Sequence, residues 1–474
     1  MSFTSIQYYL FLMLTALLYY QLPARFRTYL LLAASYFFYI SFEPRYIIFI
    51  LITTFVSYFS ALIIASSNSH RMRTAILTGA LGVEFIILGT TKYWNPIAKS
   101  TDWFGPFDIL VPLGISFYTF QTVGYLFDIY RNRLPPEKHF FRYALFLSFF
   151  PHLLAGPIEP AQSFLPQLQR YVQFEKKVFV LGCLLIIFGL FKKLVIADHL
   201  SPIVSLIFDQ PDGHKGLAVA LGLFFARYQI YCDFSGYTDI ALGSAQVLGF
   251  QLSPNFKRPF FANSITEYWR RWHMSLGIWI RQYIFYPLVS TSFSRFGVHG
   301  LILLTFLVLA IWHGGTLNFL IYGIWHGSFV IIDLKTKELR QRFYHFSGAS
   351  KHPKILHFLA VLATFFLIVV PPTLFFRATS FDQSIILLQN LIIGNWEFSD
   401  LKFINESLML TYHLKVALCA LAGLELMQWL YEVKKINLTN WSFRRLYACL
   451  VLLALIIVLY GHFVNNTKFI YMQF

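Results

Sequence analysis

The chain of 474 residues is 57% hydrophobic, and only 13% of its residues are charged. A soluble protein carries about 25% charged residues, so this composition excludes an ordinary soluble domain. Its 38 lysines and arginines exceed its 22 acidic residues, but they form no basic patch on a soluble fold, which argues against nucleic-acid binding. Apolar runs long enough to cross about 30 Å of hydrocarbon recur along the chain and indicate an all-α, polytopic membrane protein.

The first apolar segment, 5–22, follows no basic residue and precedes Arg25 and Arg27. Without a basic start and a small-residue cleavage site, it is expected to be a retained helix and not a signal peptide. Lysine and arginine collect on the cytoplasmic side of membrane proteins. This bias predicts an N-terminus outside, with Arg25, Arg27, the loop 67–73 and the connection 128–140 inside.

The hydropathy pattern predicts a helical bundle with roughly 11 to 14 membrane segments, some of them half-helices or re-entrant. The predicted segments are 5–22, 28–41, 45–66, 74–91, 107–127, 141–155, 176–196, 216–232, 235–250, 298–312, 316–334, 355–376, 382–394, 409–431 and 444–463. Basic residues are expected in the short loops between them, as at Lys192/Lys193, and 335–353 is expected to be a polar loop. We expect one membrane domain, 1–474, comprising N-terminal helices 1–140, a core 141–335 and C-terminal helices 336–474.

Residues 251–297 combine charge, proline and aromatic residues and are too polar to span a membrane comfortably. An amphipathic or re-entrant helix fits this composition. If 266–284 form one helix, Arg270, His273, Gly277 and Arg281 share a stripe about 80° wide. Such a face suits a cavity for an anionic ligand, or the arginines could reach lipid phosphates. Trp269 is a further candidate for substrate binding.

Two Trp-His-Gly tripeptides share one apolar stretch and contain His313 and His326. An ionisable group at membrane depth is a functional candidate, and histidine is a natural general base. Gly314-Gly315 predicts a helix break, which places His313 at a helix end. His326 is expected inside the next helix, hydrogen-bonded in the bundle, and is a secondary candidate. Asn318 between them is a candidate for substrate binding.

Asp233 and Ser235 lie in a polar cluster between two apolar runs. Buried carboxylates are costly unless they are paired, so Asp233 is expected to meet arginine, histidine or water. These residues could contact substrate or orient a catalytic histidine, or they could join helices.

Several reaction types are disfavoured by the absence of their motifs. The sequence contains no GxSxG, HExxH or Walker A motif and no acidic pair with metal-ligand spacing. We therefore expect no metal and no bound cofactor. A histidine base alone fits transfer of an activated acyl group to a hydroxyl. A transporter or lipid flippase, the competing class, would be expected to show an inverted repeat, and none is visible.

Six segments together resemble the membrane-bound O-acyltransferase family, in particular its bacterial polysaccharide O-acetyltransferase branch. They are QLPARFR (21–27), SFYTFQTVGYLFDIYR (116–131), LAGPIEP (154–160), YCDFSGYTDIALG (231–243), NFKRPFFANSITEYWRRWHMSLGIWIRQYIFYPL (255–288) and IWHGGTLNFLIYGIWHG (311–327). The resemblance implies a funnel-shaped helical bundle, with His313 as the family's near-invariant histidine and His273 as its second polar site residue. Gln282 departs from the aspartate that usually follows the matching arginine.

The resemblance also implies a reaction. An acyl group, expected to be acetyl, would pass from a cytoplasmic thioester such as acetyl-CoA to hydroxyls of an exported polysaccharide such as alginate, directly or through a partner protein. His313 would take the hydroxyl proton, His273 would polarise the carbonyl or orient the acceptor, and Arg270 and Arg281 would shape the access. The implied location is the bacterial cytoplasmic membrane, with periplasmic acetylation proteins as partners. The alternative on this scaffold is D-alanyl transfer to teichoic acid from an acyl carrier protein.

Overall fold

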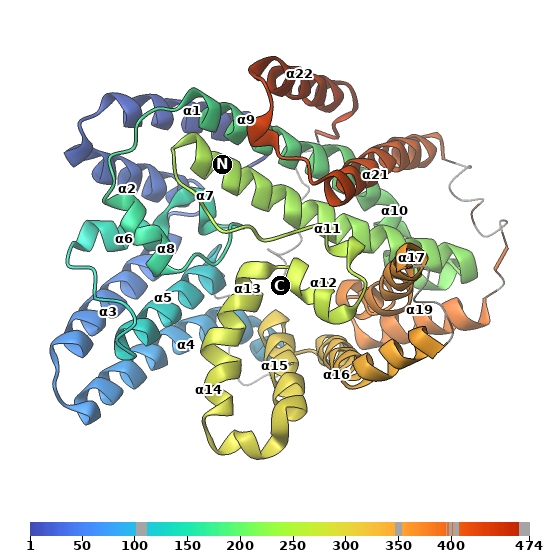
Figure 1. Cartoon of the computed structure of the whole chain (residues 1–474), viewed down its shortest axis with the longest axis horizontal. Coiled ribbons are helices and arrows are strands. Elements are labelled where there is room, and N and C mark those ends of the chain that lie inside the picture. The colour runs from blue at the N-terminus through green and yellow to red at the C-terminus, as the bar shows by residue number, and fades with distance from the viewer. Residues whose placement is uncertain (101–110, 347–352, 395, 398–400, 402–406, 464–474) are drawn as a thin grey trace. The chain divides into compact units, whose positions relative to one another are not determined.

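The computed structural model describes residues 1–100, 111–346, 353–394, 396–397, 401 and 407–463, and every regular element in them is helical (Figure 1). Eight of these helices are long and apolar enough to cross a membrane, at Tyr46–Ser66, His70–Trp94, Lys176–Asp209, Gly216–Val247, Ser292–His313, Leu317–Phe343, Leu408–Lys434 and Phe443–Tyr460. Shorter apolar helices lie at Pro353–Val369 and Phe381–Ile393. The predicted all-α, multi-pass membrane class is confirmed.

The chain packs as two compact units, each assembled from separate stretches of sequence. One comprises Met1–Phe188, Tyr237–Pro254 and Trp441–Leu450, and the other comprises Gly189–Gly236, Asn255–Asn440 and Val451–Phe474. The predicted organisation as one membrane domain stays a prediction.

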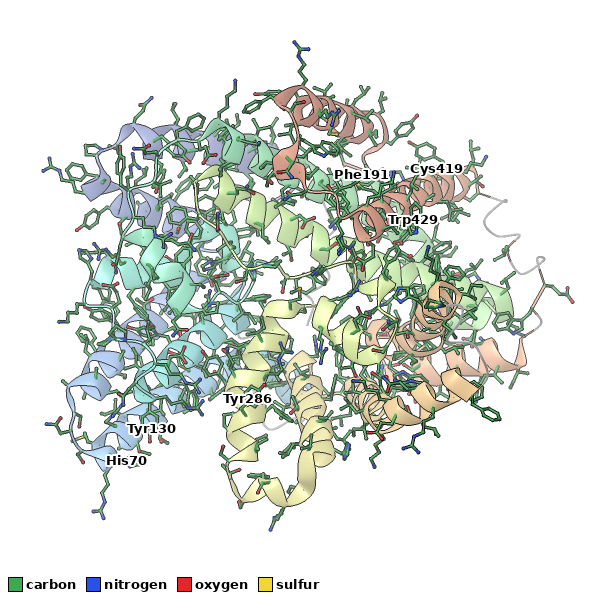
Figure 2. All side chains as sticks on the ribbon, viewed as in Figure 1. His70, Tyr130, Phe191, Tyr286, Cys419 and Trp429 are labelled. Carbon is green, nitrogen blue, oxygen red and sulfur yellow. The ribbon has the colours of Figure 1, made fainter. Side chains whose placement is uncertain are left out.

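The first unit holds most of the N-terminal helices. They are α1 (Ile6–Gln21), α2 (Ala24–Ile40), α3 (Tyr46–Ser66), α4 (His70–Ser100), α5 (Ile115–Tyr130), α6 (Phe140–Ser148), α7 (Phe150–Leu153), α8 (Ala161–Leu168) and most of α9 (Lys176–Leu190). Its core includes a cluster of aromatic rings, in which Phe38 contacts Phe3, Tyr8 and Phe150. At the start of α4 and the end of α5, Tyr130 Oη lies 3.3 Å from His70 Nε2 (Figure 2).

The second unit contains the later helices and several short helical turns. They are the π-helical segment η1 (Phe191–Ala197), α10 (Asp198–Asp209), η2 (Pro211–Gly213), η3 (Pro259–Phe261), α12 (Ile265–Arg271), α13 (Met274–Ile280), the π-helical η4 (Arg281–Phe285), α14 (Tyr286–Val289), η5 (Ser292–Phe296), α15 (Gly297–His313), α16 (Leu317–Phe346), α17 (Pro353–Ala363), η7 (Thr364–Val369), α18 (Thr373–Arg377), α19 (Phe381–Ile393), α21 (Leu408–Lys434) and η9 (Leu438–Asn440). Two helices, α11 (Gly216–Val247) and α22 (Phe443–Tyr460), contribute residues to both units. In Figure 1, α14 and α15 form the two arms of a hairpin.

Large apolar side chains project from the outer faces of these helices. Trp429 on α21 and Tyr286 on α14, both labelled in Figure 2, are 48% and 57% exposed. Exposed apolar surface on this scale is unusual for a soluble monomer. It is the surface expected where helices contact lipid.

Three predicted boundaries are wrong. The segment expected to end at 196 continues to Asp209, and the two segments expected at 216–232 and 235–250 are the single helix α11. The predicted loop 335–353 is helical to Phe346, where Arg340 donates to Thr336 and pairs with Asp333 along one face of α16. Lys335, Lys337 and Glu338 are exposed within this helix, so a polar stretch does not by itself indicate a loop. This merging, and the short length of α1, α2 and α5 at 16 or 17 residues, explain why fewer long spans are found than predicted.

In the first unit, α9 and α11 approach closely at two glycines. A Cβ atom on Gly182 would lie 2.9 Å from the carbonyl oxygen of Gly243, and a Cβ on Gly243 would lie 2.6 Å from that of Gly182. Neither position has room for a side chain. Small residues that let helix backbones approach are a common way to pack helices in membranes.

We predict that Gly243→Val lowers the thermal midpoint of the detergent-solubilised protein. Overpacking of this kind costs about 1–3 kcal/mol. Gly82→Ala on α4 is the matched control, because a Cβ atom on Gly82 would meet no other atom within 4 Å and alanine favours a helix. Size-exclusion chromatography after heating measures both variants. An unchanged midpoint for Gly243→Val would contradict the packing.

Candidate functional site

His313 is the last residue of α15, and the chain reverses immediately after it. Gly315 adopts φ +67°, a left-handed conformation that suits glycine, and its N–H donates to the carbonyl of Ala310 at 3.2 Å. The next helix, α16, begins at Leu317. The predicted break at Gly314-Gly315 is therefore confirmed. The half-buried His313 ring contacts Phe319 and Phe376.

His273 lies at a second break, between α12 and α13. Its φ is +42°, and the preceding Trp272 is extended, so the prediction of one helix across 266–284 is wrong. The backbone at 255–257 replaces the lost helical bonds. The N–H of Met274 donates to the carbonyl of Asn255 at 2.8 Å, and the N–H of Lys257 donates to that of Arg271 at 2.9 Å.

Asn255 also holds the His273 side chain. Its Oδ1 lies 3.0 Å from His273 Nδ1 and accepts from the N–H and the hydroxyl of Ser275. His273 is 3% exposed, and this burial lowers its pKa to about 3. The imidazole is therefore neutral at physiological pH. Sequence reasoning missed Asn255. It lies 18 residues before His273 in the chain, and only the fold brings the two side chains together.

His273 and His313 line one small cavity in the second unit. Its volume is about 30 Å³, roughly enough for one water molecule. The other lining residues are largely aromatic or aliphatic: Trp269, Trp272, Leu276, Phe306, Leu309, Ala310, Tyr322, Gly323 and Phe376. An apolar wall around two imidazoles strengthens the hydrogen bonds that each ring makes to a ligand.

The structure brings Trp269 to this cavity but not the two predicted arginines. Arg270 and Arg281 are exposed and are absent from the lining. Because the helix breaks at Trp272–His273, the predicted stripe does not form. Partial burial, with the like charge of Arg270 as a smaller cause, lowers the pKa of Arg281.

His326 lies inside α16, as predicted, and is fully buried. Its ring packs against Tyr268, Trp269 and Tyr322 with centroids 4.5 to 6.4 Å away. Within the described residues neither ring nitrogen has a hydrogen-bond partner, so the expected hydrogen bond in the bundle is replaced by ring packing. The neighbouring Gly327 lets α16 approach Phe306 of α15, which gives the second tripeptide a packing role.

Asp233 and Ser235 belong to a buried charge cluster and not to the cavity. Lys193 Nζ lies 2.8 Å from Asp198 and 2.7 Å from Asp233, and Lys192 Nζ lies 3.3 Å from Ser235 Oγ. The two lysines are 5% and 2% exposed, so their predicted loop position is wrong. They occupy the π-helical segment η1, and the charged partner of Asp233 is a lysine instead of the expected arginine or histidine.

Asn318 also lies outside the cavity lining. Its Nδ2 donates to the carbonyls of Ala378 and Ser380, and its Oδ1 accepts from Ser384. The side chain thus ties the start of α16 to α19. The substrate-binding roles of Asn318, Asp233 and Ser235 stay predictions.

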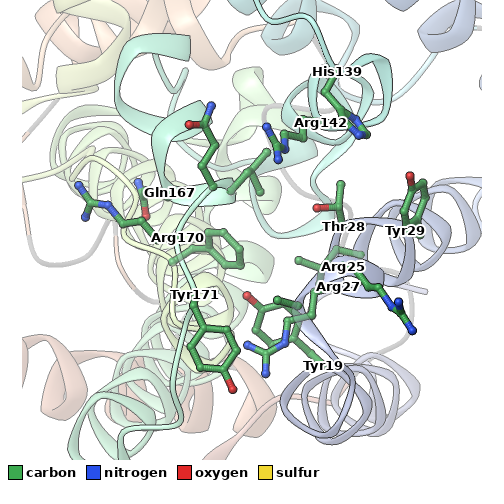
Figure 3. Close-up of a pocket in the computed structure, with 15 residues that line it drawn as sticks. Tyr19, Arg25, Arg27, Thr28, Tyr29, His139, Arg142, Gln167, Arg170 and Tyr171 are labelled. Atoms are coloured by element: carbon green, nitrogen blue, oxygen red, sulfur yellow. The ribbon is translucent and has the colours of Figure 1, made fainter.

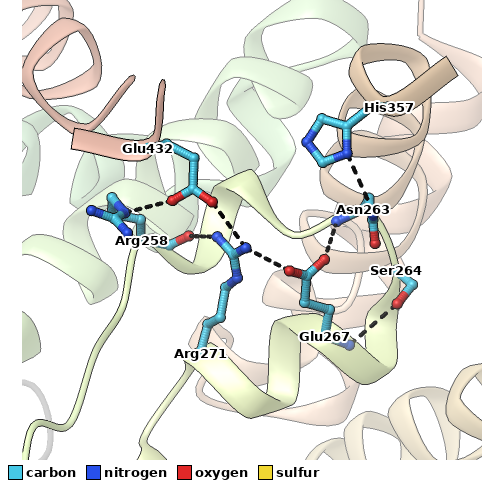
Figure 4. A network of polar contacts seen from close by, with 7 residues as sticks. All are labelled: Arg258, Asn263, Ser264, Glu267, Arg271, His357 and Glu432. Carbon is cyan, nitrogen blue, oxygen red and sulfur yellow. Dashed lines mark hydrogen bonds and ion pairs between the residues drawn. The ribbon is translucent and has the colours of Figure 1, made fainter. Parts of the chain in front are cut away.

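Ion pairs hold α12 in place beside the cavity. Arg271 pairs with Glu267 on its own helix and, at 3.1 Å, with Glu432 of α21 (Figure 4). Arg258 pairs with the other oxygen of Glu432 at 2.8 Å. These contacts fix the segment that presents Trp269, Trp272 and His273.

The chain resembles known acyltransferases over most of its length. A model of the membrane-bound O-acyltransferase family matches residues 132–375. The chain is 35% identical to a probable alginate O-acetylase of Azotobacter vinelandii, over 83% of this chain and 78% of that protein. It is 30% identical to a peptidoglycan O-acetyltransferase of Helicobacter pylori, over 76% and 73%. It is 27% identical to a teichoic acid D-alanyltransferase of Bacillus subtilis, over 50% and 63%.

We predict that Lys193→Met strongly destabilises the protein, because it leaves the carboxylates of Asp198 and Asp233 buried without this cation. Removing one partner of a buried ion pair costs about 3–5 kcal/mol. Lys215→Met, at an exposed lysine of the same unit, is the control. Thermal midpoints and the yield of monodisperse protein measure the effect. A Lys193→Met protein as stable as the control variant would show that the cluster contributes nothing to folding.

Proposed function

The chain belongs to the membrane-bound O-acyltransferase family, and on this premise we propose that it transfers an acetyl group from a thioester to hydroxyls of an exported polysaccharide. That the chain is a multi-pass O-acyltransferase follows from its family and its helices. The acetyl group and the polysaccharide acceptor are supported by the names of its relatives. The D-alanyltransferase likeness is weaker and covers half of the chain.

One observation carries the proposed mechanism: His273 and His313 line the same cavity. His313 takes the proton from the acceptor hydroxyl as that oxygen bonds to the thioester carbonyl carbon. The carbon–sulfur bond then breaks, and the proton passes from His313 to the leaving thiolate. A positioned general base of this kind contributes about 10²–10⁴ in rate.

The hydrogen bonds of Asn255 support an orienting role for His273. The N–H of Ser275 can only donate, so Asn255 presents its oxygen there and must accept from Nδ1–H of His273. A neutral imidazole with its proton on Nδ1 carries a lone pair on Nε2. His273 therefore accepts a hydrogen bond from the hydroxyl substrate and does not donate one to the thioester carbonyl.

The donor and the location complete the proposal. The donor is acetyl-CoA from the cytoplasm, and Arg270 and Arg281 shape the access of this anionic molecule. The protein lies in the bacterial cytoplasmic membrane, with the acceptor, or a periplasmic partner protein that passes on the acetyl group, on the outer side. Labelled acetyl-CoA offered to the purified protein, compared with a labelled acyl carrier protein, distinguishes this donor from that of D-alanyl transfer.

We predict that His313→Ala lowers acetylation of the exported polysaccharide by at least about a hundredfold, because the general base is lost. The measurement is the acetyl content of polysaccharide from cells that carry the variant at normal membrane levels. His299→Ala is the matched control, since His299 is an exposed histidine on the same helix. Near-normal acetylation with His313→Ala would refute the mechanism.

We predict that Asn255→Leu lowers the transfer rate more than Asn255→Asp when both are assayed above pH 7. The aspartate accepts the same hydrogen bond from His273, whereas leucine cannot. The carboxylate also raises the pKa of His273 from about 3, so activity of Asn255→Asp should fall at a higher pH than that of the wild type. Equal activity of both variants across the pH profile would exclude this positioning role.

A further inference from the structure

The first unit contains a cavity that the proposed chemistry does not use (Figure 3). Its volume is about 420 Å³, and it lies among the end of α1, the start of α2, the start of α6 and the end of α8. No aspartate or glutamate is among its lining residues. Five of the lining side chains are basic: Arg25, Arg27, His139, Arg142 and Arg170. We name it the arginine cavity.

Arg27 is built into the wall of this cavity. It is 7% exposed, and its guanidinium donates to the backbone carbonyls of Leu22, Val172 and Tyr20. The rings of Tyr19 and Tyr171 stack on it at 4.9 and 4.8 Å (Figure 3). The carbonyls orient the group, and among the described residues no carboxylate pairs with it.

The other arginines add charge around the cavity. Arg142 points into it in Figure 3, while Arg25 and Arg170 lie at its rim. The described part of the chain shows no ion pair to any of the three. A cavity lined by several arginines and by no carboxylate favours an anion, and arginine matches phosphate oxygens in a planar, bidentate manner.

A second cavity adjoins the first and extends it. Its volume is about 410 Å³, and it shares Gln167 and Arg170 with the arginine cavity. Gln162, Ser163 and Gln251 line it, so its walls offer amide and hydroxyl groups. The two together have room for a ligand considerably larger than inorganic phosphate.

The charge bias of the sequence indicates which side of the membrane this ligand comes from. Arg25 and Arg27 follow the first helix, and His139 lies in the basic connection 128–140; both segments are expected on the cytoplasmic side. The cavity is therefore expected to open to the cytoplasm, where phosphate-bearing molecules are abundant.

We propose that the arginine cavity binds the phosphate groups of an extended cytoplasmic ligand. Two sources share this chemistry, a soluble phosphoanhydride such as coenzyme A and the headgroup of an anionic phospholipid. The coenzyme A alternative rests on the donor of the proposed function, whereas binding itself requires neither His273 nor His313. Binding is therefore measured without an acceptor, and its failure leaves the roles of His273 and His313 untouched.

The test compares full-length wild-type protein with Arg142→Gln/Arg170→Gln in neutral detergent. Coenzyme A and inorganic pyrophosphate are the soluble probes, measured by calorimetry, and phosphatidylglycerol is the lipid probe, measured by native mass spectrometry against phosphatidylcholine. Arg71→Gln/Arg133→Gln is the matched control, because it removes the same charge from exposed positions of the same unit outside the cavity.

We expect the cavity variant to weaken binding of one probe at least tenfold and the control variant to change it less than twofold. Wild-type binding should weaken as salt increases, because the contacts are ionic. Loss of coenzyme A binding identifies the soluble source, and loss of phosphatidylglycerol binding identifies the lipid. The proposal is overturned if no probe binds the wild type or if the cavity variant binds every probe as well as the wild type does.

Discussion

The backbone pairing between residues 255–257 and the break at Trp272–His273 is the interaction on which the candidate site depends. A helix broken inside an apolar bundle leaves N–H and carbonyl groups that must find partners in the protein. Asn255 and Lys257 supply those partners, and the amide of Asn255 holds the imidazole of His273. The pairing satisfies the backbone groups that the break frees, and His273 at this break lines the cavity that it shares with His313.

The same constraint governs the polar groups buried elsewhere in the second unit. Lys193 meets two carboxylates where the helix widens into a π-helical segment, a geometry often associated with function. Asn318 satisfies backbone carbonyls between α18 and α19. His326 instead packs among aromatic rings. Several polar residues that attract attention in the sequence are therefore engaged in holding helices together.

The two cavities differ in size and in the chemistry of their walls. The cavity with His273 and His313 is small and mostly apolar, which suits proton transfer at a neutral imidazole shielded from water. The arginine cavity is larger, polar and basic, which suits the recognition of charge.

The sequence by itself determined the membrane class, most helix positions, the family resemblance and the end of α15 at His313. These features depend on local composition and on backbone preferences such as those of Gly314-Gly315, which act within a few residues. Only the tertiary structure decided that Asn255 orients His273, that Lys193 is the partner of Asp233, and that Arg270 lies outside the cavity. Each of these depends on residues brought together from different helices. A helical periodicity calculated for 266–284 could not include the bonds from Asn255 and Lys257 that interrupt it.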